Sequence, residues 1–115
     1  MRDCLFCKII AGEIPSKKAY EDDDVLAIYD INPQAPVHIV FMPKSHILTC
    51  ADDITDANAE IIGKIFAAIA KVAKDLGLSD GYRIINNCGP AAGQTVQHIH
   101  FHLLAGKEGM SETMI

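Results

Sequence analysis

The stretch Val96-Gln97-His98-Ile99-His100-Phe101-His102-Leu103-Leu104 alternates imidazole side chains with apolar ones over most of its length. In a β-strand, successive side chains point to opposite faces, so this period of two predicts a long final strand over residues 96–104. The three histidines would then share one face, while Ile99, Phe101 and Leu103 would share the other. One face is therefore expected to carry chemistry and the other to pack in the core.

The rest of the chain shows further strand patterns and one long helical pattern. The other expected strands lie at residues 18–21, 25–29, 37–42 and 82–87. Between residues 57 and 76, apolar side chains recur at three- and four-residue steps, which predicts a helix of about five turns. Asp56 is its expected N-cap and Gly77 its expected end. A short helix over residues 4–12 and a glycine-containing loop over residues 88–95 complete the pattern.

Strands joined by hairpins, with one long helix between the third and the fourth, predict an α+β fold. We expect an antiparallel sheet of about five strands with the helix packed on one face. The chain has 115 residues and is half hydrophobic, which is typical of one folded domain spanning residues 1–115. Its net charge of -5, with scattered basic residues, argues against a nucleic acid polymer as partner.

The chain contains no run that approaches the roughly 18 apolar residues of a membrane span, and its first residues lack the apolar core of a signal peptide. We therefore expect a cytoplasmic protein without a membrane partner. In that reducing compartment, the four cysteines are expected to be thiols or metal ligands rather than disulfides. Cys4 and Cys7 form a pair, whereas Cys50 and Cys88 stand alone and are interpreted as buried or incidental thiols.

Clustered histidines either bind a transition metal or perform nucleophilic and acid–base chemistry. The other two histidines, His38 and His46, bracket the expected third strand, so all five would meet if that strand lay near the last one. Alternate strand residues lie about 6.6 Å apart, so neighbouring members of the triad would share one metal only in a bent geometry. Glycines just before the histidines let backbone N–H groups approach an anionic oxygen. This combination favours phosphate chemistry over a strand that merely carries polar side chains.

The run from Gly93 to Leu104 resembles the motif of the histidine triad (HIT) family. Residues 4–15 are similar to the family's N-terminal segment, residues 30–38 to its ribose-binding loop, and residues 43–46 to its next turn, and together these look most like the Hint branch. The resemblance implies a HIT-like fold, a homodimer, and hydrolysis of purine nucleoside 5′-phosphoramidates such as adenosine phosphoramidate through a covalent nucleotidyl-histidine intermediate. A dinucleoside polyphosphate hydrolase of the Fhit branch, and a non-catalytic nucleotide-binding or zinc-stabilised interaction protein, remain as alternatives.

The same resemblance assigns roles to individual residues. His100 is the expected nucleophile, and His102 is expected to contact the phosphate. His38 would lie beside His102 and tune its protonation, while Thr95 would assist the leaving group. Asp30 would accept hydrogen bonds from the ribose, and Ile31 would line the nucleoside pocket. The full set of implied nucleotide contacts is Asp30, Ile31, Asn87, Gly93, Gln94, Thr95, His100 and His102.

The spacing Cys4-x-x-Cys7 is by itself typical of either zinc binding or redox chemistry, because a zinc site usually needs two further ligands. Some HIT proteins with this N-terminal pair hold structural zinc, and by that resemblance the ligands would be Cys4, Cys7, His46 and His98. Reduced thiols without metal are the alternative, and no organic cofactor is expected. Residues 105–115 lack the tryptophan-containing ending of much of the Hint branch, which leaves the leaving group open.

Overall fold

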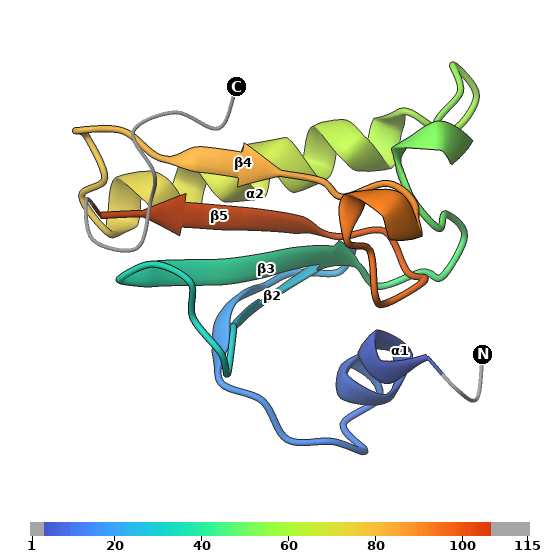
Figure 1. Ribbon diagram of the computed structural model, residues 1–115, viewed down its shortest axis with the longest axis horizontal. Helices are drawn as coiled ribbons and strands as arrows, with labels where there is room; N and C mark the ends of the chain where they lie inside the picture. The colour runs from blue at the N-terminus through green and yellow to red at the C-terminus, as the bar shows by residue number, and fades with distance from the viewer. Residues whose placement is uncertain (1–3, 107–115) are drawn as a thin grey trace.

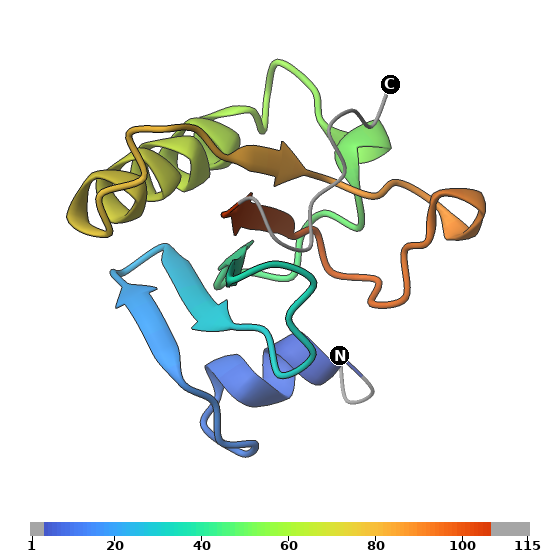
Figure 2. The same ribbon diagram turned by 60° about the vertical axis from the view of Figure 1, so that its left-hand side comes forward.

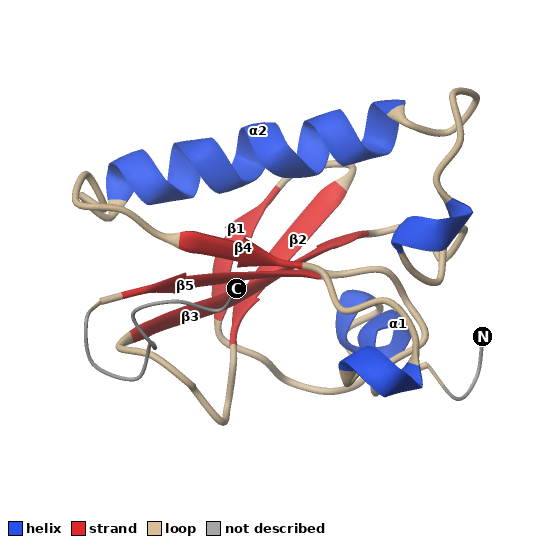
Figure 3. Ribbon diagram, turned by 45° about the horizontal axis from the view of Figure 1, so that its top comes forward, coloured by secondary structure: helices blue, strands red, loops and turns tan. Residues whose placement is uncertain are grey.

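The computed structural model describes residues 4–106, and these residues form a sheet with a helix on each face (Figures 1 and 3). The sheet is antiparallel, with its five strands in the order β1-β2-β3-β5-β4. The strands are β1 (Lys18–Glu21), β2 (Val25–Tyr29), β3 (Val37–Pro43), β4 (Arg83–Ile85) and β5 (Phe101–Ala105). This arrangement confirms the expected α+β fold class. Most of the C-terminal segment that lacks a tryptophan, residues 107–115, lies outside the described residues.

Helix α2 (Glu60–Asp75) covers one face of the sheet, as the apolar stripe predicts. Its buried side chains pack against those of β2, β3 and β5 in one cluster, which includes Ile65, Ile69, Val72, Ile39, Phe41 and Leu103. Each fully buried aliphatic side chain of this kind contributes about 1.5–3 kcal/mol relative to exposure. The helix ends as expected, because Gly77 follows it with a φ of 69°, a conformation that glycine adopts without strain.

The start of α2 differs from the prediction. Residues 56–59 form a turn, and Ala59 occupies the N-cap position without a side-chain cap. The backbone N–H of Thr55 donates to Asn58 Oδ1, and Asn58 Nδ2 donates to the carbonyl of Asp53. These contacts hold the chain in a turn just before the helix, so the prediction of Asp56 as N-cap was wrong.

Helix α1 (Leu5–Ile10) lies on the opposite face of the sheet. Phe6 and Ile9 are buried there against Leu26, Ile28, Val40 and Met42. The sequence predicted this short helix but gave no position for it. The sulfur of Cys4 caps the helix by accepting a hydrogen bond from the Cys7 backbone N–H at 3.3 Å.

The last strand is shorter than the expected range of residues 96–104. Ile99 directs its backbone N–H to the carbonyl of Leu48 at 2.9 Å, and the carbonyl of His100 accepts from Asn86 Nδ2 at 2.9 Å. These groups are therefore not available to a β-ladder, and β5 begins at Phe101. The alternation nevertheless holds, because Ile99, Phe101 and Leu103 join the core under α2.

Two short 3-10 turns lie in the loops, η1 (Ala51–Asp53) after β3 and η2 (Pro90–Ala92) between β4 and β5. Figure 2 shows the orange loop that contains η2 projecting away from the sheet. Among the described residues, no helix is both long and apolar enough to cross a membrane.

Candidate active site

The pairing of β3 with β5 brings distant histidines together. In this ladder Val40 lies opposite His102, and His38 lies opposite Leu104. The third strand therefore lies beside the last one, which was the condition for all five histidines to meet. They form two groups, one of His38, His100 and His102, and a second in which His46 and His98 lie beside the N-terminal cysteines.

A chain of hydrogen bonds determines where His38 and His102 carry their protons. The backbone N–H of Gln34 donates to Nδ1 of His38 at 3.0 Å, so the proton of a neutral His38 is on Nε2. That Nε2–H donates to Nδ1 of His102 at 2.8 Å, and the Asp30 carboxylate lies 3.5 Å from the same nitrogen. His102 therefore carries its own proton on Nε2, which makes this atom a hydrogen-bond donor.

His100 is held in the opposite tautomer. Its Nδ1 lies 2.8 Å from the backbone carbonyl of His98, and because a carbonyl only accepts, Nδ1 carries the proton. The Nε2 atom of His100 is then left with a free lone pair. The Phe6 ring packs against the His100 imidazole in a T-shaped arrangement, at 4.9 Å between centroids, and this contact helps to hold the imidazole in place.

Burial keeps these imidazoles neutral. Desolvation lowers the pKa of His100 and the pKa of His38 below the ordinary histidine value. Desolvation, with further repulsion from His100 and His38, lowers the pKa of His102 to about 4. At neutral pH, His100 is thus an uncharged base with a free Nε2, which is the form required of a nucleophile.

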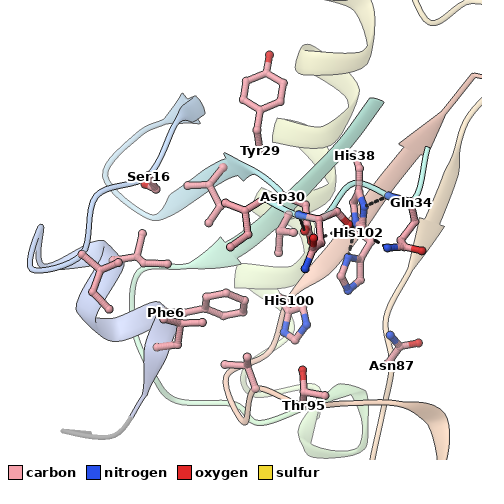
Figure 4. A pocket seen from close by; sticks show the side chains of 18 of the residues that line it. Phe6, Ser16, Tyr29, Asp30, Gln34, His38, Asn87, Thr95, His100 and His102 are labelled. Atoms are coloured by element: carbon pink, nitrogen blue, oxygen red, sulfur yellow. Dashed lines mark hydrogen bonds and ion pairs between the residues drawn. The ribbon is translucent and has the colours of Figure 1, made fainter. Parts of the chain in front are cut away.

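A cavity of about 660 Å³ opens beside these rings, a size ordinary for a small-molecule site. Figure 4 shows His100 and His102 on one side of it with Asn87 and Thr95 nearby, and Phe6 of α1 on another side. All but one of the predicted nucleotide contacts line this cavity, namely Asp30, Ile31, Asn87, Gly93, Thr95, His100 and His102. The sequence did not predict that Phe6 and Ile9 of α1 form an apolar wall of this cavity, because their spacing indicates only a helix.

Gln94 is the exception. Its side chain is buried, with 6% of its surface exposed, and it does not line the cavity. Its Oε1 accepts the backbone N–H of Gly89 at 2.9 Å, while Nε2 donates to the carbonyls of Thr49 at 2.7 Å and Val96 at 3.1 Å. The side chain thus holds the η2 loop in place, and the nucleotide contact expected at Gln94, which is one of its backbone, stays a prediction.

Cys4, Cys7, His46 and His98 form a compact cluster whose candidate ligand atoms all lie within 4.8 Å of one another. His98 Nε2 donates to the carbonyl of Pro43 at 2.8 Å, which leaves Nδ1 with a lone pair toward the sulfurs. This nitrogen is 3.4 Å from Cys4 Sγ and 3.6 Å from Cys7 Sγ, and His46 Nδ1 is 3.1 Å from Cys7 Sγ. Two such atoms bound to one tetrahedral zinc would be about 3.5 Å apart, so the donor set fits zinc.

Cys50 and Cys88 are free thiols as expected, with Cys50 buried and Cys88 exposed. The structure also places them near each other, because the influence of Cys88 is the largest cause of the raised pKa of Cys50. Gln94 bridges the segments that carry them through its hydrogen bonds to Thr49 and Gly89, a contact that no local pattern in the sequence reveals.

Comparisons with known proteins agree with this geometry. A model of the HIT domain matches residues 11–109. The 14 kDa zinc-binding protein of Zea mays is 49% identical over 105 residues, which cover 90% of this chain and 82% of that protein. The structure of a HIT family hydrolase from Clostridium thermocellum matches with a TM-score of 0.92 and 51% identity, covering 100% of this chain and 99% of that chain.

A histidine triad nucleotide-binding protein from Candida albicans is also similar, with a TM-score of 0.78 and 37% identity over 88% of this chain and 73% of that chain. The family model spans most of the sequence, including the three alternating histidines and the loop before them. By this match and these relatives, the chain belongs to the HIT domain family.

Proposed function

We propose that this protein is a nucleotide-binding hydrolase that cleaves purine nucleoside 5′-phosphoramidates through a covalent nucleotidyl-histidine intermediate. The observation that carries the proposal is the tautomer of His100, whose Nδ1–H donates to the His98 carbonyl and whose Nε2 is left unprotonated beside the cavity. Two similar proteins support the class of activity, since one is named a hydrolase and another a nucleotide-binding protein.

In the first step, Nε2 of His100 forms a bond to the α-phosphorus while the phosphorus–nitrogen bond to the amine breaks. The amine takes a proton as it leaves, and the Thr95 hydroxyl lies on the cavity wall where it can assist that transfer. In the second step, water attacks the phosphorus, the bond between phosphorus and Nε2 breaks, and the proton that the water loses passes to solvent, which releases the nucleoside monophosphate and regenerates neutral His100. The His98 carbonyl stabilises the positive imidazole ring of the intermediate through the Nδ1–H bond.

The phosphoryl oxygens need hydrogen-bond donors that are in place before the reaction. His102 offers its Nε2–H, because its Nδ1 is occupied by His38. Asn87 and Gly93 line the same cavity, so the Asn87 amide and the backbone N–H groups of this loop are further candidates. One preorganised donor of this kind typically contributes about 3 kcal/mol to transition-state stabilisation.

The nucleoside would lie toward α1. Asp30 lines the cavity and accepts the Asn32 backbone N–H on Oδ1 at 2.8 Å, which fixes its carboxylate for ribose hydroxyls. The apolar wall from Phe6 and Ile9 suits the flat face of a purine. Ile31 lines the cavity with 94% of its surface exposed, and a bound base would cover it.

The decisive experiment incubates the protein with adenosine phosphoramidate and, separately, with a diadenosine polyphosphate. We expect phosphoramidate cleavage, a trapped adduct carrying one nucleoside monophosphate on His100, and loss of both in His100→Ala. His100→Gly with added imidazole is the matched variant, because a free imidazole can fill the space and restore turnover if the ring is the nucleophile.

Each other outcome contradicts part of the proposal. Preference for the polyphosphate would move the protein to the Fhit type of activity. Binding of adenosine monophosphate without turnover of either substrate would make it a non-catalytic nucleotide-binding protein.

We also propose that Cys4, Cys7, His46 and His98 hold a structural zinc ion. All four ligand positions come from the protein, so the site is closed and the ion would supply folding stability rather than catalysis. The zinc-binding name of the maize relative supports this assignment. Metal analysis of protein purified without added zinc should give about one ion per chain in the wild type and a clear loss in Cys4→Ser, whereas no zinc in either would refute it.

The proposed partner is a second copy of the chain, in the cytoplasm. The strand β4 forms an edge of the sheet, and Tyr82 before it and Phe66 of α2 expose apolar surface. Such an edge is commonly covered by another protein surface. Light scattering after size-exclusion chromatography should give the mass of a dimer, and Tyr82→Asp should shift it toward a monomer; a monomeric wild type at micromolar concentration would refute the dimer.

A further inference from the structure

Two cysteines that are 38 positions apart in the sequence lie near each other at the start of the η2 loop. Cys50 occupies the N-cap position of η1, and Cys88 lies just before η2. The two thiols lie near each other, and Cys88 is the largest cause of the raised pKa of Cys50. Cys50 is buried with 8% of its surface exposed, whereas Cys88 is exposed.

The backbone around the pair is held by contacts that do not involve the thiols. Gln94 donates to the carbonyl of Thr49, directly before Cys50, and accepts the N–H of Gly89, directly after Cys88. One buried amide therefore bridges the two segments that carry the cysteines. This bridge keeps both cysteines in place, so their proximity does not depend on a flexible surface loop.

We propose that Cys50 and Cys88 form a reversible thiol–disulfide site, oxidised by low-molecular-weight disulfides, that tethers the η2 loop to the segment before η1. The exposed Cys88 thiolate attacks one sulfur of the small disulfide and displaces one small thiol. The Cys50 thiolate then attacks the Cys88 sulfur and displaces the second small thiol. The two protein thiols lose two electrons, which reduce the small disulfide to two thiols, and the protein protons leave on those products.

The tether would act on the phosphate side of the cavity. Asn87 precedes Cys88, and Gly93 and Thr95 follow η2, and all three line the cavity. The site is separate from the other cysteine pair, because Cys4 and Cys7 contact imidazoles of the candidate zinc cluster. Formation of the disulfide requires only the two thiols and a small disulfide, so it can be tested whether or not the hydrolase assignment is correct.

The test maps disulfides in the full chain after treatment with oxidised glutathione and acid quenching. Trypsin places Cys50 in the peptide of residues 45–64 and Cys88 in that of residues 84–107, whereas Cys4 and Cys7 fall in residues 3–8. We expect the first two peptides to be joined as the main cross-link, and reductant should release them. Cys88 that carries only glutathione, or that joins a second copy of its own peptide, would overturn the proposal.

Single variants separate the two steps. In Cys50→Ser, Cys88 should stop at the mixed disulfide with glutathione, and in Cys88→Ser, the buried Cys50 should remain largely unmodified. Oxidised wild type should melt roughly 5 °C or more above the reduced protein, because the cross-link restricts the unfolded chain, while neither variant should gain stability on oxidation. A joined peptide without any rise in the melting temperature would refute the tethering role.

Discussion

Replacing Gln94 with alanine should destabilise the protein although the residue lies in a loop. The buried amide makes three hydrogen bonds, one from the Gly89 backbone N–H and one each to the carbonyls of Thr49 and Val96. A typical intramolecular hydrogen bond contributes about 0.5–1.5 kcal/mol, and a buried partner left unpaired costs a similar amount or more. Gln94→Ala should therefore lower the free energy of unfolding by about 3 kcal/mol.

Urea unfolding followed by circular dichroism measures this change as a lower midpoint with an unchanged slope. Gln97→Ala is the matched control, because Gln97 is the same residue type three positions away and is exposed; it should change stability by no more than about 0.5 kcal/mol. A loss below about 1 kcal/mol in Gln94→Ala, or equal losses in the two variants, would show that the loop does not depend on this bridge.

Three further results are expected. Between pH 7 and pH 4 the protein should lose about 2 kcal/mol of stability through His102, after allowance for solvent screening. The reason is that the pKa of His102 is about 4 in the folded protein but about 6.5 in the unfolded chain, so the unfolded chain takes up the proton first as the pH falls. His102→Gln should flatten this dependence of stability on pH, and an unchanged profile would contradict the lowered pKa. Phe6→Ala should cost about 3–5 kcal/mol in urea unfolding and weaken adenosine monophosphate binding in calorimetry, because the ring is buried and packs on His100; unchanged affinity would show that α1 does not shape the pocket. Removal of zinc with a chelator should lower the melting temperature of the wild type but not of Cys4→Ser, since the ligands join α1 to distant segments; an equal response in both would argue against the site.

Much of the fold could be predicted from the spacing of apolar residues, because the side chains that this spacing places on one face are the ones that pack in the core. The strands expected at residues 18–21 and 25–29 are present with those bounds, and the apolar stripe of α2 lies on the sheet as expected. The alternation around His100 correctly sorted the two faces even where no strand forms. Periodicity reports which side of the chain is buried, and this information survives when the backbone leaves the ladder.

The errors arise where distant contacts decide the local structure. Residues 99 and 100 leave the sheet because Leu48 and Asn86 take their backbone hydrogen bonds. The structural role of the Gln94 side chain was not predicted, because one of its partners is the carbonyl of the distant Thr49. The meeting of Cys50 with Cys88 likewise depends on how two loops pack, so residue spacing alone could not predict it.

One residue, His98, serves both groups of histidines with different atoms. Its ring faces the cysteine sulfurs, whereas its backbone carbonyl orients the ring of His100. Every amino acid has that carbonyl, so the orientation of His100 does not require an imidazole at position 98. Substitutions that remove the cysteine cluster and the His98 side chain can therefore leave the orientation of His100 unchanged, provided that other packing compensates for the lost stability.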